Sequence, residues 1–595
     1  MFIRDKWALG LILALLVLVV AVYSLVPLLS RSQGMFPILS GADGAYYALR
    51  LKTALEGDVV ISCPFDPSLR SSQTFIPNLM ESTWANLIRP WVGTDMSLAM
   101  AVTYTVLPVC IFLLFIFFLN LVFQDLALAG WVSFWGVLDP SIYYWKPFLV
   151  SQVDPSEPLA YFRYANPMLF QIPFIVAFGS AFHYLLVNRK KMENLLSWQV
   201  GLTLVCTGGL LFYVQVFYAT FFFGLMVIYS LISALKGKWQ SALATALIVV
   251  GMTIIGFPEI FKNLSLFVSP IVPEVIYRIG CLVKHRHPYF LFHKGLIGTF
   301  IFYQFISWRH WNVRWKFLTA SMIAGFVCLN QNLITGLTSQ DQHYFRALMV
   351  PYVFTMTDIW LRLQDKIKNE RIKLILKVCV MTAIVFCFFR GGFKVIKLIQ
   401  EVPRNADGEY VSRRILKTVQ LVKEKVQDPE GLVLANPTFT YDLEILSNVH
   451  VYIDDYFYHC IISDDLLFKR WLMLGKSFGW SRDQVSQRLN DFIHSTQLPY
   501  WFFGLPNSYT GVRNEYTDEN KQSRIQQWLD AYMQSDFAEL LQFENKIRSL
   551  PRYLLETPGF KANLDLLQKY FILRSLGEVP EEHTRLWELE YRGSK

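Results

Sequence analysis

The chain has few charged residues and lacks the common nucleotide-binding, hydrolase and metalloprotease motifs. Only 17% of its 595 residues are charged, whereas soluble domains carry about a quarter. Its eight cysteines form no C-x-x-C pair and no cluster with histidine, so neither a disulfide framework nor a zinc site is indicated. The sequence contains no P-loop, no GxGxxG, no nucleophile elbow and no H-E-x-x-H. These absences argue against a soluble enzyme of those classes.

Apolar residues are abundant instead, with 53% hydrophobic and 16% aromatic residues, in several runs of helical length. About 20 predominantly apolar residues suffice to cross the hydrocarbon core of a bilayer as a helix. The sequence therefore predicts a mostly α, polytopic membrane protein. We expect eleven transmembrane helices, over residues 7–29, 97–123, 126–145, 167–187, 199–214, 217–235, 241–257, 289–307, 317–334, 345–362 and 373–390.

The basic residues predict the sidedness of this array, because cytoplasmic loops are rich in lysine and arginine. If the N-terminus is cytoplasmic, every longer inside loop is basic: 189–191, 236–238, 309–316 and 366–373. The net charge of +9 then reflects membrane topology, and no nucleic-acid partner is expected. We predict a multi-pass plasma (inner) membrane protein with a cytoplasmic N-terminus.

An odd number of spans places the rest of the chain outside the cytoplasm. Residues 1–390 are expected to form the transmembrane domain, with a long first outer loop at 30–96. Residues 391–595 are expected to form an extracytoplasmic soluble α/β domain, because strand-like and helical patterns alternate there. The strand-like runs are 431–435, 449–453 and 500–503, and the helical patterns are 411–427, 465–475, 482–495 and 519–547.

A candidate catalytic carboxylate, Asp43, follows the first span. Gly41 and Gly44 flank it, which allows the backbone to turn tightly and to approach a ligand. The pattern over residues 46–55 predicts an amphipathic helix that lies along the membrane surface and begins near Asp43. Asp43 could simply cap this helix. Alternatively, it could accept a proton from an acceptor hydroxyl or hold a metal ion, while the tyrosines beside it stack on a sugar.

The second outer loop carries acids, an arginine and aromatic residues close together. Asp154 and Glu157 precede Arg163, Tyr164 and Asn166. An arginine can grip a phosphate with two parallel hydrogen bonds, and the asparagine could cap the helix that follows. The alternatives are a solvated loop of ion pairs and an aromatic belt at the membrane interface.

Two later outer loops add further polar groups. Gln340, Asp341 and His343 precede Arg346, whose charge near the membrane face is costly unless it is paired or functional. His343 could act as a general base or a phosphate ligand, or it could merely be hydrogen-bonded. Arg278 stands near the basic cluster 284–287, which could bind a diphosphate or an anionic lipid, or could be ordinary solvated surface.

The stretch from Gly41 to Arg50 resembles the first outer loop of the GT-C glycosyltransferases, in particular the oligosaccharyltransferase catalytic subunit and its bacterial relatives. By this resemblance, Asp43 would be the metal-binding or base carboxylate, Asp154 or Glu157 the acid of the second loop, and Arg346 the arginine of a later loop. Two features differ from the family. The two acids of the second loop are three residues apart rather than in a D-x-D or E-x-D pair, and the WWDYG-type motif is absent. Peptide N-glycosylation is therefore not expected.

The resemblance implies an enzyme that transfers a sugar from a polyprenyl-phosphate-linked donor to a glycan, lipid or protein acceptor at the outer face of the cell envelope. A divalent metal, Mg or Mn, could be held by Asp43 and Asp154. The predicted catalytic residues are Asp43, Asp154, Glu157 and His343. The predicted substrate-binding residues are Tyr46, Tyr47, Arg50, Arg163, Tyr164, Asn166, Arg278, Gln340, Asp341 and Arg346.

Two other classes of protein remain open from the sequence. A transporter or flippase of lipid-linked glycans would place charges near the bilayer midplane, on broken helices in related halves of the chain. Here the ionisable residues gather in loops and no repeat is evident. A non-catalytic assembly protein would use the outer domain to bind a partner, and the outer acids would then be surface features.

Overall fold

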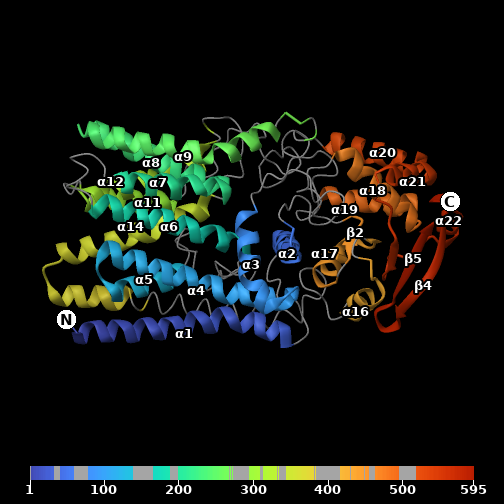
Figure 1. The fold of residues 1–595 in the computed structure, drawn as a ribbon, viewed down its shortest axis with the longest axis horizontal. Helices are drawn as coiled ribbons and strands as arrows, with labels where there is room; N and C mark the ends of the chain where they lie inside the picture. The colour runs from blue at the N-terminus through green and yellow to red at the C-terminus, as the bar shows by residue number, and fades with distance from the viewer. Residues whose placement is uncertain are drawn as a thin grey trace.

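The computed structural model describes eighteen parts of the chain: residues 2–32, 41–58, 78–138, 165–187, 198–266, 268–269, 271, 294–308, 312–331, 333, 344–380, 382, 416–428, 431–447, 449–453, 463–494, 518–547 and 549–594. Figure 1 shows an elongated molecule, with a bundle of long helices at one end and a smaller domain that contains a sheet at the other.

The bundle consists of α1 (Phe2–Ser32), α4 (Met96–Phe123), α5 (Leu126–Leu138), α6 (Ala165–Val187), α7 (Trp198–Leu210) with the short η5 (Leu211–Tyr213), α8 (Val216–Leu235), α9 (Trp239–Leu266), α11 (Lys294–Ile306), α12 (Val313–Leu329) and α14 (Tyr344–Lys366). Residues 370–380 are helical as well. Five described helices, α1, α4, α6, α8 and α9, contain a stretch long and apolar enough to cross a membrane. Each of the eleven predicted ranges contains a described helix, while the count of eleven spans stays a prediction.

The directions of the helices follow from contacts at both ends of each pair. Gly130 of α5 faces Ile12 of α1, and the Tyr23 hydroxyl of α1 donates to the carbonyl oxygen of Val137 at 2.5 Å, so α1 and α5 run parallel. The ring of Phe174, in the first half of α6, lies 5.0 Å from that of Tyr218 in the first turn of α8. Farther along, Phe182 of α6 and Tyr229 of α8 both contact Phe317 of α12, so α6 and α8 run parallel as well.

Further pairs align α14 and α4 with α6. Gln171 contacts Met349 near the starts of α6 and α14, and the Phe178 and Phe354 rings lie 5.3 Å apart farther along both helices. Gly179 of α6 likewise faces Phe118 of α4. The starts of α4, α6, α8 and α14 therefore lie at one end of the bundle, which we call the domain end.

Aromatic rings and close helix contacts hold the bundle together. Phe182 stacks on Phe317 at 4.7 Å between ring centroids and contacts Phe354 at 5.8 Å. Gly179 has no room for a side chain, because an added Cβ would lie 2.3 Å from Phe118. Inside a bilayer such packing replaces the hydrophobic effect, since lipid tails are as apolar as the side chains.

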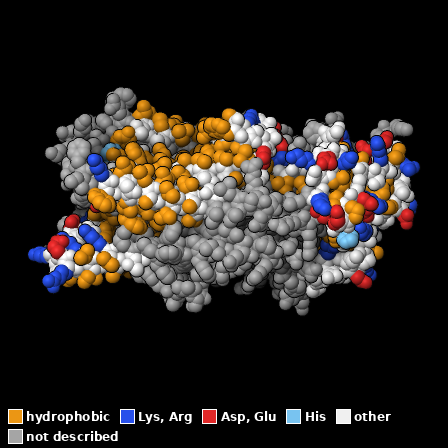
Figure 2. Space-filling view, turned by 90° about the horizontal axis from the view of Figure 1, so that it is seen from below, with side chains coloured by type: hydrophobic (Ala, Val, Ile, Leu, Met, Phe, Trp, Pro, Cys, Tyr) orange, Lys and Arg blue, Asp and Glu red, His pale blue; other side chains and the backbone are white. Residues whose placement is uncertain are grey.

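The outer surface of α9 is apolar along most of its length. Its exposed side chains include Leu243, Leu247, Val250, Ile254, Phe257 and Phe261. They recur every three or four residues and so form one stripe on the helix. Figure 2 shows a broad apolar area on the bundle and mixed charges on the other domain. This contrast is what a lipid-facing bundle beside a solvated domain requires.

The second domain contains a five-stranded sheet in the order β2-β1-β3-β5-β4. The strands are β1 (Leu432–Leu434), β2 (His450–Val451), β3 (Tyr553–Glu556), β4 (Phe571–Val579) and β5 (Thr584–Tyr591). β1 pairs in parallel with β2 and β3, whereas β5 pairs antiparallel with β3 and β4. The mixed sheet and its helices agree with the predicted α/β class. The predicted strands at 431–435 and 449–453 are β1 and β2, and the third, at 500–503, lies outside the described residues.

The helices of this domain are α16 (Leu416–Lys425), α17 (Pro437–Leu446), α18 (Asp464–Ser477), α19 (Arg482–His494), α20 (Asp518–Gln534), α21 (Phe537–Lys546) and α22 (Leu564–Tyr570). The helical pattern predicted over 519–547 corresponds to two helices, α20 and α21. The side chain of Asp536 accepts a hydrogen bond from the Ala538 amide and starts the second helix.

Candidate functional site

Helix α2 (Gly41–Glu56) carries the Asp43 motif and lies at the domain end, beside α3 (Leu79–Val92). Asp43 is the third residue of α2 and so lies in its first turn, where a carboxylate interacts favourably with the helix dipole. The side chains of residues 41–46, which include Asp43 and Tyr46, are outside the described part of the structure. Tyr47 is half-buried. Helix capping and catalysis therefore both stay open for Asp43.

The prediction of a surface helix over residues 46–55 was wrong in its placement. Every residue from Ala48 to Leu55 is buried, the polar ones included. The helix contacts α3, α4 and α6 on the bundle and α17 of the second domain. An amphipathic pattern shows that one face is apolar, but it cannot show that another domain covers the polar face.

Arg50 was predicted to bind substrate, but the structure places it in a buried ion pair with Glu81 of α3. Its Nε and Nη2 atoms lie 2.8 and 2.7 Å from Glu81 Oε1, and both side chains are 0% exposed. A guanidinium enclosed in this way joins α2 to α3, and its role in substrate binding stays a prediction. Sequence reasoning missed Glu81, because nothing in a sequence links two residues 31 positions apart.

Two more hydrogen bonds fix the position of α3. Arg89 donates from Nη2 to the carbonyl oxygen of Ala54 in α2 at 2.9 Å. Trp84 donates from its indole nitrogen to Thr103 Oγ1 of α4 at 2.9 Å. The predicted outer loop 30–96 thus contains two helices that are tied to each other and to the bundle.

Arg346 lies in the first turn of α14, also at the domain end, and is half-buried. Polar groups surround this turn. The Tyr344 hydroxyl lies 2.9 Å from Thr220 Oγ1 of α8, and Arg346 lies close enough to the Tyr218 hydroxyl to interact with it electrostatically. Among the described residues, none forms a hydrogen bond with that buried hydroxyl. Sequence reasoning identified Arg346 and missed Tyr218, which stands inside an apolar run.

Helix α6 connects the two parts of the site, because it contacts both α2 and α14. The helix that carries Asp43, α2, and the helix that carries Arg346, α14, therefore both pack against one shared helix. Asn166 is the second residue of α6, within the described backbone but with its side chain outside the description. The other predicted residues lie outside the described residues: Asp154, Glu157, Arg163, Tyr164, Arg278, Gln340, Asp341 and His343.

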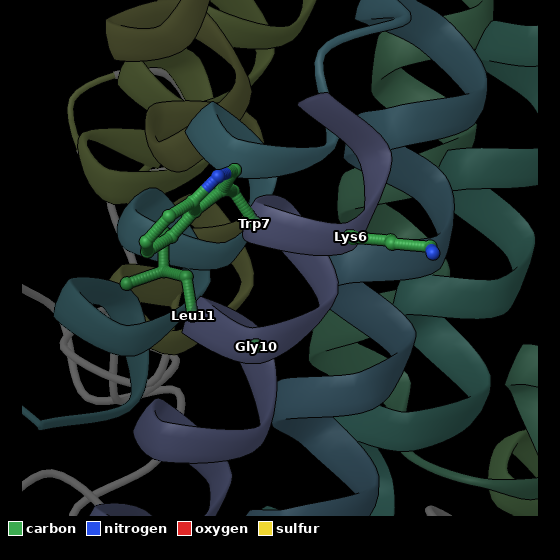
Figure 3. A pocket seen from close by; sticks show the side chains of 4 residues that line it. All are labelled: Lys6, Trp7, Gly10 and Leu11. Atoms are coloured by element: carbon green, nitrogen blue, oxygen red, sulfur yellow. The ribbon is translucent and has the colours of Figure 1, made fainter. Parts of the chain in front are cut away.

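The described side chains include no group of three or more histidine, cysteine, aspartate or glutamate residues that could hold a metal ion. The predicted pair, Asp43 and Asp154, is not among these side chains. A pocket of about 570 Å³ lies at the other end of the bundle, lined by Lys6, Trp7, Gly10 and Leu11 of α1 (Figure 3). These residues begin the first helix, away from the domain end, and so they are not part of the candidate site.

The fold is thus that of a multi-pass membrane protein, with two short helices and an α/β domain gathered at one end of its bundle. By sequence, the chain matches no protein-family model and no curated protein. By structure, it is similar to the archaeal oligosaccharyltransferase AglB from Archaeoglobus fulgidus, solved in complex with an inhibitory peptide and a dolichol-phosphate. The TM-score is 0.49 at 11% identity, over 97% of this chain and 73% of AglB.

It is also similar to ArnT from Cupriavidus metallidurans. The apo structure gives a TM-score of 0.49 at 10% identity, over 98% of both chains. The structure bound to undecaprenyl phosphate gives 0.41 at 11% identity, again over 98% of both chains. These similarities concern the path of the chain, and at such identities they assign no role to any residue.

Proposed function

We propose that this protein is a membrane glycosyltransferase of the GT-C type, which transfers a sugar from a polyprenyl-phosphate-linked donor to an acceptor at the extracytoplasmic face. The observation that carries the proposal is the arrangement around α6. A helix with Asp43 in its first turn and a helix with Arg346 in its first turn both contact α6 at the domain end. A carboxylate and a guanidinium at one membrane face are the groups that such a transfer needs.

In this reaction Asp43 acts as the general base. Its carboxylate accepts the proton of an acceptor hydroxyl while the hydroxyl oxygen forms a bond to the anomeric carbon of the sugar. The bond between that carbon and the phosphate oxygen breaks, and the polyprenyl phosphate leaves with the bonding electrons. Attack on the face opposite the leaving group inverts the anomeric configuration.

Arg346 holds the phosphate in this proposal, with Arg163 and Arg278 as further ligands. A positive charge at a membrane face is costly unless it is paired or functional, and arginine binds phosphate through two parallel hydrogen bonds. The Tyr218 hydroxyl, which has no hydrogen-bond partner among the described residues, supports this assignment. A buried hydroxyl without a partner costs about 1–3 kcal/mol, and a phosphate oxygen would accept its hydrogen bond.

A divalent metal, Mg or Mn, is proposed as an aid that would neutralise the phosphate, held by Asp43 and Asp154. Hard cations of this kind prefer carboxylate oxygens. No step above depends on the ion, since Asp43 performs the proton transfer and the arginines bind the phosphate. The acceptor is a glycan, a lipid or a protein.

The test is sugar transfer by purified protein in nanodiscs, with a panel of radiolabelled polyprenyl-phosphate sugars. Asp43→Asn should lower kcat about 100-fold or more, because a positioned general base contributes about 10²–10⁴-fold. The matched control is Asp483→Asn, which also removes a carboxylate from the first turn of a helix, α19, but on an exposed surface. Full activity of the Asp43 variant would remove the role assigned to this residue.

A second pair of variants tests whether Arg346 binds the phosphate of the donor. Arg346→Ala should raise the KM for the donor at least tenfold, whereas Arg371→Ala, at an exposed position of the helical segment 370–380, should leave it unchanged. A wild-type protein that carries the lipid-linked sugar across a vesicle membrane without transferring it would refute the proposal in favour of a flippase. A protein that neither binds nor transfers any donor of the panel would refute it as well.

A further inference from the structure

Lys52 is a buried lysine at the contact between α2 and the second domain. Its side chain is 7% exposed. The ammonium group donates hydrogen bonds to the carbonyl oxygens of Glu444 and Ser447, the latter at 2.6 Å. Glu56 lies 3.6 Å from the ammonium, one turn farther along α2. Taking an ammonium group out of water is expensive, so these partners must compensate for lost hydration.

The two carbonyl groups belong to the C-terminal end of α17 (Pro437–Leu446), which carries partial negative charge. The last carbonyl groups of a helix have no partner within the helix, and a lysine side chain can satisfy them. Lys52 therefore caps a helix that is nearly 400 residues away in sequence. The Glu444 side chain is engaged separately, because its Oε1 atom lies 2.9 Å from His450 Nδ1 of β2. This links the contact to the sheet of the second domain.

Helix α2 transmits this contact to its own first turn. Lys52 follows Asp43 by nine residues, which corresponds to about 13 Å along a helix. Beyond Lys52 in sequence, Arg89 holds the carbonyl oxygen of Ala54, and before it Glu81 holds Arg50. The helix is thus fixed from the α3 side and from the α17 side. A shift at α17 moves α2 as a unit, because a helix of this length is stiff.

We propose that Lys52 is a positioning residue, through which the second domain sets the position of the α2 first turn and thereby of Asp43. This inference rests on the proposed function, in which Asp43 is the base. Misplacing a catalytic group by about 1 Å can cost about 10²-fold in rate. Loss of the contact should therefore lower the rate of the chemical step and leave donor binding at Arg346 unchanged.

The experiment compares Lys52→Met and Lys52→Arg with Lys423→Met, which removes an exposed lysine on α16. Hydrogen exchange of intact protein in nanodiscs reports the contact. Lys52→Met should accelerate exchange in α2 and α17 at least tenfold, with α4 and the strands β3 to β5 unchanged. In the transfer assay it should lower kcat at least tenfold, with the donor KM within twofold of wild type. Lys52→Arg should keep both the exchange rates and kcat close to the wild-type values, and Lys423→Met should change neither.

Each other outcome overturns the proposal. Unchanged exchange in Lys52→Met would show that Lys52 does not hold the two helices together. Faster exchange with unchanged kcat would make the residue purely structural. Full activity of Asp43→Asn would remove the proposed function itself, whereas an inactive Asp43→Asn with a fully active Lys52→Met removes the positioning role alone. If Lys52→Met does not fold, Lys52→Gln is measured instead. Its neutral amide can donate to at most one of the two carbonyl groups, so exchange in α2 and α17 should accelerate and kcat should fall, both to a smaller extent, and an unchanged value of either overturns the proposal.

Discussion

The buried ion pair between Arg50 and Glu81 predicts a large and specific loss of stability when one partner is removed. Both side chains are 0% exposed, and Arg50 Nη2 lies 2.7 Å from Glu81 Oε1. Replacing Arg50 by Met removes the guanidinium that contacts the buried Glu81 carboxylate, and breaking a buried ion pair by removing one partner typically costs 3–5 kcal/mol. We expect the free energy of opening of α2 to fall by about that amount in Arg50→Met. This corresponds to an increase in exchange rate of roughly 10²-fold to several thousand-fold, because about 1.4 kcal/mol is a factor of ten.

The measurement is hydrogen exchange of the α2 amides, compared among Arg50→Met, Glu81→Leu and the double variant. The double variant should recover most of the loss, because two apolar side chains of similar volume can replace a buried ion pair at little net cost. The control is Lys417→Met, which breaks an exposed ion pair with Glu581 of 3.0 Å and should change stability by at most about 1 kcal/mol. The reasoning would be refuted if Arg50→Met lowered the free energy of opening by less than about 1 kcal/mol. It would also be refuted if the loss in the double variant equalled the sum of the losses in the two single variants.

Two further predictions test packing and charge. Gly179→Ala should destabilise the bundle by about 1–3 kcal/mol and lower its thermal midpoint, because the new Cβ would lie 2.3 Å from Phe118. The control is Gly10→Ala, whose Cβ would have no atom within 4 Å and which should be neutral or stabilising. A hydrogen bond from Lys417 lowers the pKa of Glu581 below its ordinary value. The interaction of Glu581 with Lys417 therefore stabilises the folded protein at pH values above the ordinary pKa of a glutamate. This stabilisation is lost as the pH falls through the lowered pKa of Glu581. Glu581→Gln should abolish this part of the acid dependence of unfolding, and an unchanged dependence would contradict the assignment.

Local pattern was enough to locate most elements of the bundle. A run of apolar residues predicts a helix wherever it stands, because within a bilayer the backbone must satisfy its own hydrogen bonds. The break at Gln215, between α7 with η5 and α8, was likewise visible as a polar residue in an apolar run. In the second domain the short apolar runs at β1 and β2 were predicted, whereas β3, β4 and β5 were missed. The pairing of β3 with β1 joins distant segments and has no local signal. β4 and β5 are neighbours in sequence, and they were missed because β-propensity depends strongly on context.

Some residues of the candidate site could be identified from the sequence, and others could not. Arg346 stood out in the sequence, because a charge near the membrane face is costly unless it is paired or functional. Asp43 stood out because glycines flank it and tyrosines follow it. Tyr218 gave no such signal, since tyrosine is ordinary within an aromatic-rich helix.

The sequence by itself therefore determined the membrane-spanning character of the chain, the α/β character of its second domain and the residue types offered at one membrane face. Only the tertiary structure decided what those residues do to one another. In the structure, Arg50 is the buried partner of Glu81. The helix that was predicted to lie along the membrane surface is enclosed between two domains. The physical reason is that burial and charge pairing depend on segments hundreds of residues apart, as Lys52 and Ser447 show. Hydropathy and helical period depend on neighbours alone.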